Sequence, residues 1–339
     1  MALKCDIVIV GGGVLGLCVA VELTARGHRV IVLDPGAANA SSVAAGMIAP
    51  AMESVLDGAT SDRARLLREA ADLWPEFARR TSIALKPGPS VWRGDSADEV
   101  ANAARRLGFA ADVRDGGVWT DDRQVEPEPA LVALRRRAGH VVAGEALSLT
   151  RSDGGWAVGT AEGTVKARAV VLATGAAAPP EGVPESVMTL VNAIVPIRGQ
   201  IGWTGEPAGD VVVRGESGYL APMGKGTVIG ASMGTGRRDL SVDGMEAETL
   251  LAVAERLTAR DLRDRPVAWR VGIRGATPDG LPMAGPSGEP GLHLALAPRR
   301  NGWLLGPLVG QSVADGIEGL APAPPARALD PQRFSRPAG

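Results

Sequence analysis

A single arginine, Arg274, is surrounded by glycine, proline and small apolar residues in the segment VGIRGATPDGLPMAGP. The only acidic residue of that segment is Asp279. A guanidinium group stays protonated in a protein, and burying it without a partner is costly. Its counter-charge is therefore either a carboxylate of the fold, such as that of Asp279, or an anion that arrives with a ligand.

A second chemical pattern lies near the N-terminus, where Gly11, Gly13 and Gly16 form G-x-G-x-x-G. The glycines follow the apolar run CDIVIV and open an apolar helical stretch that reaches Gly27. In that context the glycines permit a tight turn, a close approach of backbone to a pyrophosphate, and close packing of helix on strand. Asp34 ends the next apolar run, where a carboxylate accepts hydrogen bonds from ribose hydroxyls. The pattern predicts a dinucleotide site.

Two further segments favour FAD over NAD as that dinucleotide. VVLATGA (170–176) is an apolar strand far downstream that ends in Thr-Gly, and flavoproteins use such a strand to close the sheet beside the cofactor. ASSVAAGMIAP (40–50) contains small side chains, which let backbone donors reach a phosphate or a ring edge. The same composition is also typical of a flexible loop.

Composition excludes several classes of protein. The chain has 339 residues, enough for two domains, and its net charge of −2 provides no general field for nucleic acid. No apolar run is long enough to cross a membrane, and the N-terminus does not resemble a signal peptide, so we expect a cytoplasmic protein. Two cysteines, Cys5 and Cys18, are too few for a disulfide scaffold or a four-cysteine zinc site. One Tyr and three Phe argue against stacking on nucleic-acid bases.

Hydrophobic periodicity predicts where the elements lie. Asp243 and Glu246 are spaced like a capping pair at the start of one helix. The predicted elements are a strand–helix–strand unit over 5–34, helices over 62–80, 96–107, 243–262 and 301–320, a strand pair over 156–176, short strands between about 190 and 233, and an irregular tail from 321.

Several motifs occur in the order found in one enzyme family. They are IVIVGGGVLGLCVAVELTARGHRVIVLD, SSVAAGMIAP, GYLAPMGKGTVIGASM, GIRGATPDGLPMAGP and RRNGWLLGPLVG. Over roughly residues 5 to 320 the chain resembles the D-amino-acid oxidase superfamily, and most of all its glycine oxidase branch, whose flavoenzyme makes the imine used to build the thiazole of thiamine. The first motif is common to many flavoproteins, whereas the combination of the others is more specific.

The resemblance implies an α/β fold: a Rossmann-like FAD-binding domain with an inserted α+β substrate domain on a mixed antiparallel sheet. The FAD-binding domain would comprise residues 1–75, 138–188 and 270–325, and the substrate-binding domain residues 76–137 and 189–269, with an irregular tail at 326–339.

The resemblance also implies the residues that bind FAD. FAD would be non-covalent, because no cysteine follows Cys18 to form the thioether found in some sarcosine oxidases. The implied FAD-binding residues are Gly11, Gly12, Gly13, Val14, Leu15, Gly16, Asp34, Pro35, Ala40, Ser41, Ala45, Gly46, Met47, Ala146, Gly175, Pro298, Arg299, Arg300, Asn301, Gly302, Trp303 and Leu304.

In the substrate pocket, the resemblance makes Arg274 the anchor for a substrate carboxylate, with Tyr219 as its hydroxyl partner. Met47, Met233 and Arg300 would stand around the same pocket. Tyr219 also fits a half-buried strand aromatic, and both methionines also fit core positions.

No general base, nucleophile pair or metal cluster is visible in the sequence. The three histidines, His28, His140 and His293, stand in contexts typical of structural residues. We therefore expect no catalytic side chain and no metal. Orientation by Arg274 and Tyr219 would suffice for hydride transfer from a neutral amine to flavin N5, giving an imine, then 2-oxo acid, ammonia and hydrogen peroxide.

The chain departs from the glycine oxidase pattern at two places. Gly275 follows the anchor where the family has proline, and Pro298-Arg299 replaces His-aromatic. Arg299 could therefore serve a second carboxylate, which leaves glycine, sarcosine, a D-amino acid, or an N-substituted or acidic amino acid open as substrates. Oxygen or another electron acceptor would be the second partner, and the chain could form a homo-oligomer. The alternatives are a dehydrogenase that uses a quinone or electron-transfer protein, an NAD-dependent dehydrogenase, and a non-catalytic flavin-binding module.

Overall fold

A parallel sheet forms the centre of one half of the molecule. The computed structural model describes residues 3–259, 262 and 264–335. In spatial order the strands are β10 (His140–Ala143), β3 (Val30–Asp34), β2 (Ile7–Val10), β14 (Ala169–Leu172), β22 (Leu292–Leu296) and β21 (Met283–Pro286). The first five are parallel, and β21 is antiparallel to β22. β2, β3, β14 and β22 are buried at every residue, as the nearly unbroken apolar runs of their sequences require.

The two faces of this sheet have different covers. α1 (Val14–Ala25) and α9 (Gly302–Ile317) pack against the face that carries Ile7 and Ile9. The alternate residues of β2, Val8 and Val10, point to the other face of the sheet. There they pack beneath a second, four-stranded sheet and α7 (Glu185–Asn192). The strands of the covering sheet, in order, are β1 (Leu3–Lys4), β13 (Gly163–Ala167), β12 (Gly155–Thr160) and β11 (Ser148–Ser152).

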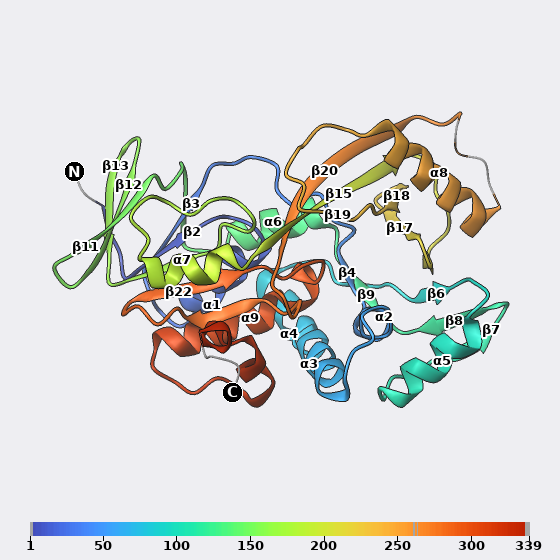
Figure 1. Ribbon diagram of the computed structural model, residues 1–339, viewed down its shortest axis with the longest axis horizontal. Helices are drawn as coiled ribbons and strands as arrows, with labels where there is room; N and C mark the ends of the chain where they lie inside the picture. Colours follow the sequence, from blue (N-terminus) through green and yellow to red (C-terminus); the bar gives the residue numbers. More distant parts are fainter. Residues whose placement is uncertain (1–2, 260–261, 263, 336–339) are drawn as a thin grey trace.

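The other half of the molecule is built on a nine-stranded mixed sheet. Its strands are β19 (Gly234–Thr235), β15 (Val195–Thr204), β18 (Gly226–Gly230), β17 (Gly218–Met223), β16 (Val212–Gly215), β6 (Ser90–Trp92), β8 (Gly117–Thr120) and β7 (Asp112–Arg114), with β20 (Val267–Ala276) paired along β15. α8 (Gly244–Thr258) packs on this sheet. β15 and β20 run from this half towards the parallel sheet (Figure 1). Residues 271–273 of β20 border the same space as residues 11–13 of the glycine-rich turn.

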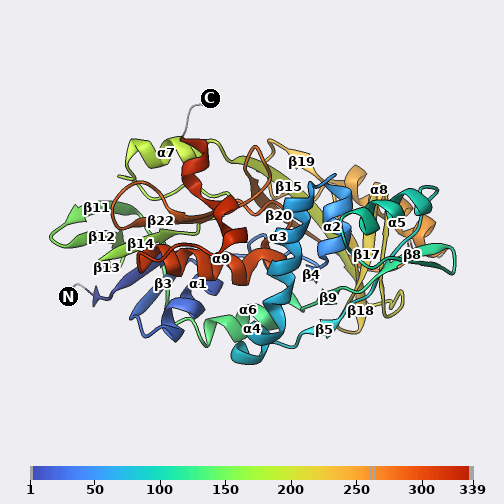
Figure 2. The ribbon, with the colours of Figure 1, turned by 90° about the horizontal axis from the view of Figure 1, so that it is seen from below.

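The remaining helices lie between and beside these sheets. α3 (Ser61–Asp72) stands between α9 and α2 (Pro50–Leu56) in Figure 2, and it contacts both. The other elements are α4 (Trp74–Thr81), α5 (Ala97–Arg106), α6 (Pro127–Arg135) and a small sheet of β4 (Met47–Ile48), β9 (Arg123–Gln124) and β5 (Lys86–Pro87).

The prediction of an irregular tail was wrong for residues 324–334. Two 3₁₀ helices form there, η1 (Pro324–Leu329) and η2 (Pro331–Phe334). Proline opens each of them with its preset backbone angle, and the Asp330 side chain accepts a hydrogen bond from the Gln332 N–H. Ala326 and Leu329 are buried in the core that contains α3 and α9. Residues 336–339 of the predicted tail lie outside the described residues.

Candidate active site

The glycine-rich turn between β2 and α1 leaves no room for side chains. A Cβ atom on Gly12 would lie 2.1 Å from Asp34 Oδ2, and one on Gly16 would lie 2.1 Å from the Gly11 carbonyl oxygen. Gly11 itself has a φ of +114°, and a Cβ there would meet the Ala173 carbonyl oxygen at 2.3 Å. Backbone rather than side chain therefore faces whatever ligand occupies this turn.

The small-residue segment reaches the same helix end. Ser41 Oγ accepts a hydrogen bond of 3.0 Å from the Val14 N–H in the first turn of α1. Trp303 of α9 donates from its indole nitrogen to the Ser41 carbonyl oxygen at 3.1 Å. Exposed N–H groups and the positive end of a helix favour anions. In this structure the Val14 N–H at the start of α1 donates to the Ser41 hydroxyl. A phosphate oxygen is an equally suitable acceptor for that N–H group.

A groove of about 530 Å³ extends from this turn. It continues through a narrow space of about 100 Å³ into a pocket of about 540 Å³. Shared lining residues join these spaces: Gly13 and Ser41 border the first two, and Arg274 and Trp303 border the last two. An elongated dinucleotide fits this shape, with its phosphates at the glycine turn and its reactive ring at the pocket. The glycine cradle and the connected groove therefore fit FAD.

Most residues predicted to bind FAD are brought together along this path. Gly16 and Leu304 are exceptions, because Gly16 packs against the turn and Leu304 is buried in the core. Asp34 lines the groove, but one of its carboxylate oxygens already pairs with Arg135 at 2.9 Å. The predicted residues that line the path are Gly11, Gly12, Gly13, Val14, Leu15, Asp34, Pro35, Ala40, Ser41, Ala45, Gly46, Met47, Ala146, Gly175, Pro298, Arg299, Arg300, Asn301, Gly302 and Trp303.

Arg274 reaches the pocket from β20 by lying across β15. A Cβ atom on Gly199 of β15 would fall 2.5 to 2.7 Å from the Arg274 guanidinium atoms, so the glycine makes room for the group. The Arg274 Nη1 group contacts the Met233 sulfur at 3.0 Å. Within the part of the chain that the structure describes, no carboxylate lies within ion-pair distance of Arg274. Burial lowers its pKa from the usual value for arginine.

Asp279, the nearest acidic residue along the chain, has another partner. Its carboxylate pairs with Arg333 at 2.8 Å and also accepts from the Thr277 hydroxyl and the Leu281 N–H. The alternative in which Asp279 neutralises Arg274 is therefore wrong. The long-range partner comes from η2, the 3₁₀ helix in the segment expected to be irregular.

Tyr219 occupies the same pocket and is also placed by a glycine. A Cβ atom on Gly230, its cross-strand neighbour, would lie 2.4 Å from the Tyr219 hydroxyl oxygen. Burial raises the pKa of this hydroxyl above its usual value, partly opposed by the nearby positive charge of Arg274. Tyr219 therefore keeps its proton and remains a hydrogen-bond donor.

A buried ionic cluster forms another wall of the pocket. Glu53 of α2 pairs with Arg214 of β16 at 2.8 Å and with Arg300 at the start of α9. Arg300 also pairs with Asp57 at 2.8 Å, and Arg299 pairs with Asp57 at 2.6 Å. The prediction that Arg299 is available for a second carboxylate is thus wrong, because Arg299 pairs with Asp57 and does not line the pocket.

The ionisation of this cluster follows from its charges. Despite burial, Arg214 and Arg300 lower the pKa of Glu53 to about 2. Asp122 is buried as well, and burial raises its pKa to about 6 against the attraction of Arg214. Glu53 is therefore ionised at neutral pH and is a poor proton acceptor.

Sequence reasoning missed Arg214, Glu53 and Gly199. Arg214 stands five residues before Tyr219 in the run VVVRGESGY, and a charged residue in a run of buried strand residues was a usable signal. Nothing local marks Glu53 or Gly199. Two further residues were not predicted, Arg238 and Leu240. They line the groove and belong to the segment between β19 and α8.

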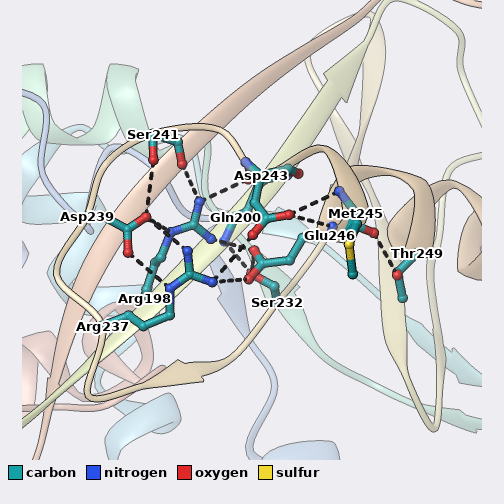
Figure 3. A network of polar contacts seen from close by, with 10 residues as sticks. All are labelled: Arg198, Gln200, Ser232, Arg237, Asp239, Ser241, Asp243, Met245, Glu246 and Thr249. Carbon is teal, nitrogen blue, oxygen red and sulfur yellow. Dashed lines mark hydrogen bonds and ion pairs between the residues drawn. The ribbon is translucent and has the colours of Figure 1, made fainter.

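A network of polar contacts around Arg198 holds that segment (Figure 3). The Arg198 side chain is fully buried. Arg198 pairs with Asp239 at 3.0 Å and with Glu246 of α8. Glu246 also accepts a hydrogen bond of 2.7 Å from Ser232. Asp243 caps α8 as predicted, accepting from the Met245 and Glu246 N–H groups, whereas the Glu246 side chain turns to the arginines. The network therefore fixes a segment that borders the groove and connects it to Ser232, which lines the pocket.

None of the three histidines lines the pocket. His28 contacts Glu318 at 2.9 Å, and His293 is buried in β22, where burial lowers its pKa to about 4. Among the described residues, no group of three or more metal-ligating side chains is found. The described part of the chain also contains no helix with the length and apolarity needed to cross a bilayer.

A three-layered unit with a glycine turn, joined by one groove to a pocket that carries a free guanidinium, defines a dinucleotide-dependent oxidoreductase. Residues 6–316 match the model of the DAO family, described as FAD dependent oxidoreductase, and the chain belongs to this family. The match confirms the predicted family, fold class and cofactor, and it decides between FAD and NAD in favour of FAD.

The chain is also similar to individual proteins along nearly its whole length. The glycine oxidase of Geobacillus kaustophilus is 29% identical over 360 residues, covering 94% of each protein. Its crystal structure superposes with a TM-score of 0.84 at 27% identity and full coverage of both chains. The bifunctional protein ThiO/ThiG of Nostoc sp. is 32% identical over 92% of this chain. The bifunctional tRNA-modifying protein MnmC of Caulobacter sp. is 29% identical over 96% of it. The chain spans about half the length of these two bifunctional relatives, 52% and 57%.

Proposed function

We propose that this oxidoreductase oxidises the amino group of a small amino acid, such as glycine, sarcosine or a D-amino acid. In the complete reaction the amino acid, oxygen and water give a 2-oxo acid, hydrogen peroxide and ammonia, or the corresponding amine when the nitrogen is substituted. Similarity to glycine oxidase along nearly the whole chain supports this reaction class.

The observation that carries the proposal is the position of Arg274. It borders both the narrow end of the cofactor groove and the pocket, with a thioether rather than a carboxylate against one of its N–H groups. A guanidinium binds a carboxylate through two parallel hydrogen bonds, which are strong and directional. Arg274 therefore acts as the anchor that orients the substrate at the groove.

The other pocket residues complete this orientation. The Tyr219 hydroxyl, kept protonated by burial, donates a hydrogen bond to the same carboxylate. When FAD is bound, its ring supplies the acceptor for the hydride that leaves the α-carbon. Glu53 is already paired with two arginines, so the substrate amine must reach the pocket in its neutral form. Positioning then supplies most of the rate enhancement.

The test is substitution of Arg274 by alanine and by lysine. We expect kcat/KM for the best amino acid to fall by roughly 10- to 100-fold, mainly through KM, because lysine cannot reproduce the two-pronged contact. Bound flavin, measured by its visible absorbance, should not change. Arg270→Ala is the matched control, since Arg270 lies on the same strand but pairs with Glu128 at the surface.

Two outcomes would contradict the proposal. If Arg274→Ala leaves the reduction of flavin by amino acids unchanged, Arg274 does not bind the substrate carboxylate. Failure of glycine, sarcosine and D-amino acids to reduce the wild-type flavin under anaerobic conditions would remove the substrate class. Peroxide formed per amine oxidised distinguishes an oxidase from a dehydrogenase that uses another acceptor.

A further inference from the structure

A second arginine in the pocket is placed much like Arg274. The Arg214 Nη2 group contacts the Met47 sulfur at 3.2 Å, as the Arg274 Nη1 group contacts the Met233 sulfur at 3.0 Å. A thioether is only a weak hydrogen-bond acceptor. Each of these N–H groups would therefore make a stronger hydrogen bond to a carboxylate oxygen in the place of the sulfur.

Arg214 retains unused donor capacity despite its ion pair. It is 3% exposed, and Glu53 engages only its Nη1 group. Its Nε atom is buried and has no hydrogen-bond partner. Buried donors are normally satisfied in folded proteins, so this side chain is short of acceptors.

The charges around the pocket also favour a ligand with more than one negative charge. Three arginines line it (Arg214, Arg274 and Arg300), and the only buried carboxylate among its lining residues is Glu53. Arg300 pairs with two carboxylates, those of Glu53 and Asp57, although its Nη2 atom makes no hydrogen bond. Arg214 and Arg274 are therefore the two cationic groups with a donor directed at a methionine sulfur. They come from strands on opposite sides of β17, which carries Tyr219: Arg214 from the neighbouring β16, and Arg274 from β20 beyond β18 and β15. The charges of both act on the Tyr219 hydroxyl.

We propose that the preferred substrate is an amino dicarboxylate, whose α-carboxylate binds Arg274 and whose second carboxylate binds Arg214 by displacing the Met47 sulfur. This inference rests on the proposed amino-acid oxidation and names its substrate class. Arg274 also borders the narrow end of the groove, whereas Arg214 borders only the pocket. The second carboxylate therefore lies on the side away from the cofactor, and the carbon next to the α-carboxylate lies nearest to it.

The test compares substrates that differ only in charge. D-Aspartate is paired with D-asparagine, and iminodiacetate with its monoamide, in anaerobic reduction of the wild-type holoenzyme. We expect the diacid of at least one pair to be favoured about tenfold or more in the ratio of reduction rate to dissociation constant. Arg214→Met should abolish that preference, measured as the ratio of each diacid to its own monoamide, so that any general loss of activity cancels. Arg93→Met is the matched control, because Arg93 is exposed and bonds the Leu257 carbonyl outside the pocket.

Equilibrium binding supplies a readout that does not depend on turnover or on a folded variant. Succinate, titrated into the wild-type holoenzyme, should perturb the flavin absorbance at a dissociation constant at least about tenfold lower than that of its monoamide, succinamate. If neither charge pair nor the succinate comparison shows a preference, the inference is overturned. If no amine reduces the flavin but succinate still binds more tightly than succinamate, the proposed oxidation fails and the second carboxylate site stands.

Discussion

At the scale of single residues, the pocket depends on glycines as much as on the groups that touch a ligand. The Arg274 guanidinium lies over Gly199, and the Tyr219 hydroxyl lies over Gly230, each where a Cβ atom would collide. When a long side chain from one strand lies across the neighbouring strand, the residue beneath it must be glycine, because any Cβ atom would occupy the same space. These glycines therefore determine where the anchor and its hydroxyl partner can stand.

Gly199→Ala tests this dependence. The new Cβ would displace the guanidinium, which is the far end of a flexible side chain, so we expect KM to rise about tenfold or more while the melting temperature changes little. Steady-state kinetics and thermal unfolding provide the measurements. Gly205→Ala serves as control, because Gly205 is exposed and a Cβ there meets only the Trp203 ring at 3.9 Å. An unaltered KM in Gly199→Ala would show that Arg274 does not need this position.

At the scale of elements, α1 and α9 are brought close by a row of glycines on α9. A Cβ on Gly302 would lie 3.2 Å from Val14, one on Gly306 would lie 2.9 Å from Cys18 Sγ, and one on Gly310 would lie 2.8 Å from the Cys18 carbonyl oxygen. The spacing of four residues places the three glycines on one face of the helix. Close packing here holds the N-termini of both helices at the cofactor groove.

Gly310→Ala should reverse the usual effect of alanine in a helix. Alanine normally stabilises a helix by about 1 kcal/mol relative to glycine. Here the methyl group meets the backbone of α1, so we expect the free energy of unfolding to fall by roughly 1 to 3 kcal/mol. Chemical denaturation measures the change. Gly244→Ala in α8 is the control, because a Cβ there meets no atom within 4 Å and should leave stability equal or higher. Equal stabilisation by both substitutions would show that α1 moves aside at no cost.

At the scale of the whole molecule, the groove and pocket draw residues from both sheets. Gly13 follows β2 of the parallel sheet, whereas Arg274 lies on β20 of the mixed sheet. The division into an FAD-binding domain (1–75, 138–188 and 270–325) and a substrate-binding domain (76–137 and 189–269) stays a prediction, and its boundary at residue 270 falls within β20 of the mixed sheet. A ligand that contacts both sheets should therefore stabilise the molecule as a unit.

Removal of FAD tests that coupling. At a free FAD concentration 100 times the dissociation constant, linkage gives about 2.7 kcal/mol of additional stability. We expect the apoprotein to melt at a lower temperature and the melting temperature to rise with added FAD. FMN, which lacks the adenosine half, is the matched ligand and should produce a smaller rise because it leaves the groove beside Asp34 empty. Equal effects of FAD and FMN would show that the groove contributes no binding energy.

The sequence by itself determined the features whose contacts are local or whose pattern is periodic. The glycine turn, the strands of the parallel sheet and the cap of α8 follow from residues a few positions apart. Motif order indicated the family and, through it, Arg274 and Tyr219. The predictions of the turn, the strands and the cap succeeded because tight turns, fully buried strands and helix starts each require a recognisable spacing of residue types. The roles of Arg274 and Tyr219 stay predictions.

Only the tertiary structure decided which charges pair with which. Arg214 and Glu53 are 161 residues apart, and Arg300 and Glu53 are 247 apart. No spacing rule connects such positions, because their proximity depends on how α2, α9 and the mixed sheet pack. The same packing pairs Asp279 with Arg333 and Asp57 with Arg299. Among the described residues, Arg274 therefore has no carboxylate partner. Whether an arginine serves the fold or a ligand is thus settled by the acceptors that folding brings within reach of it.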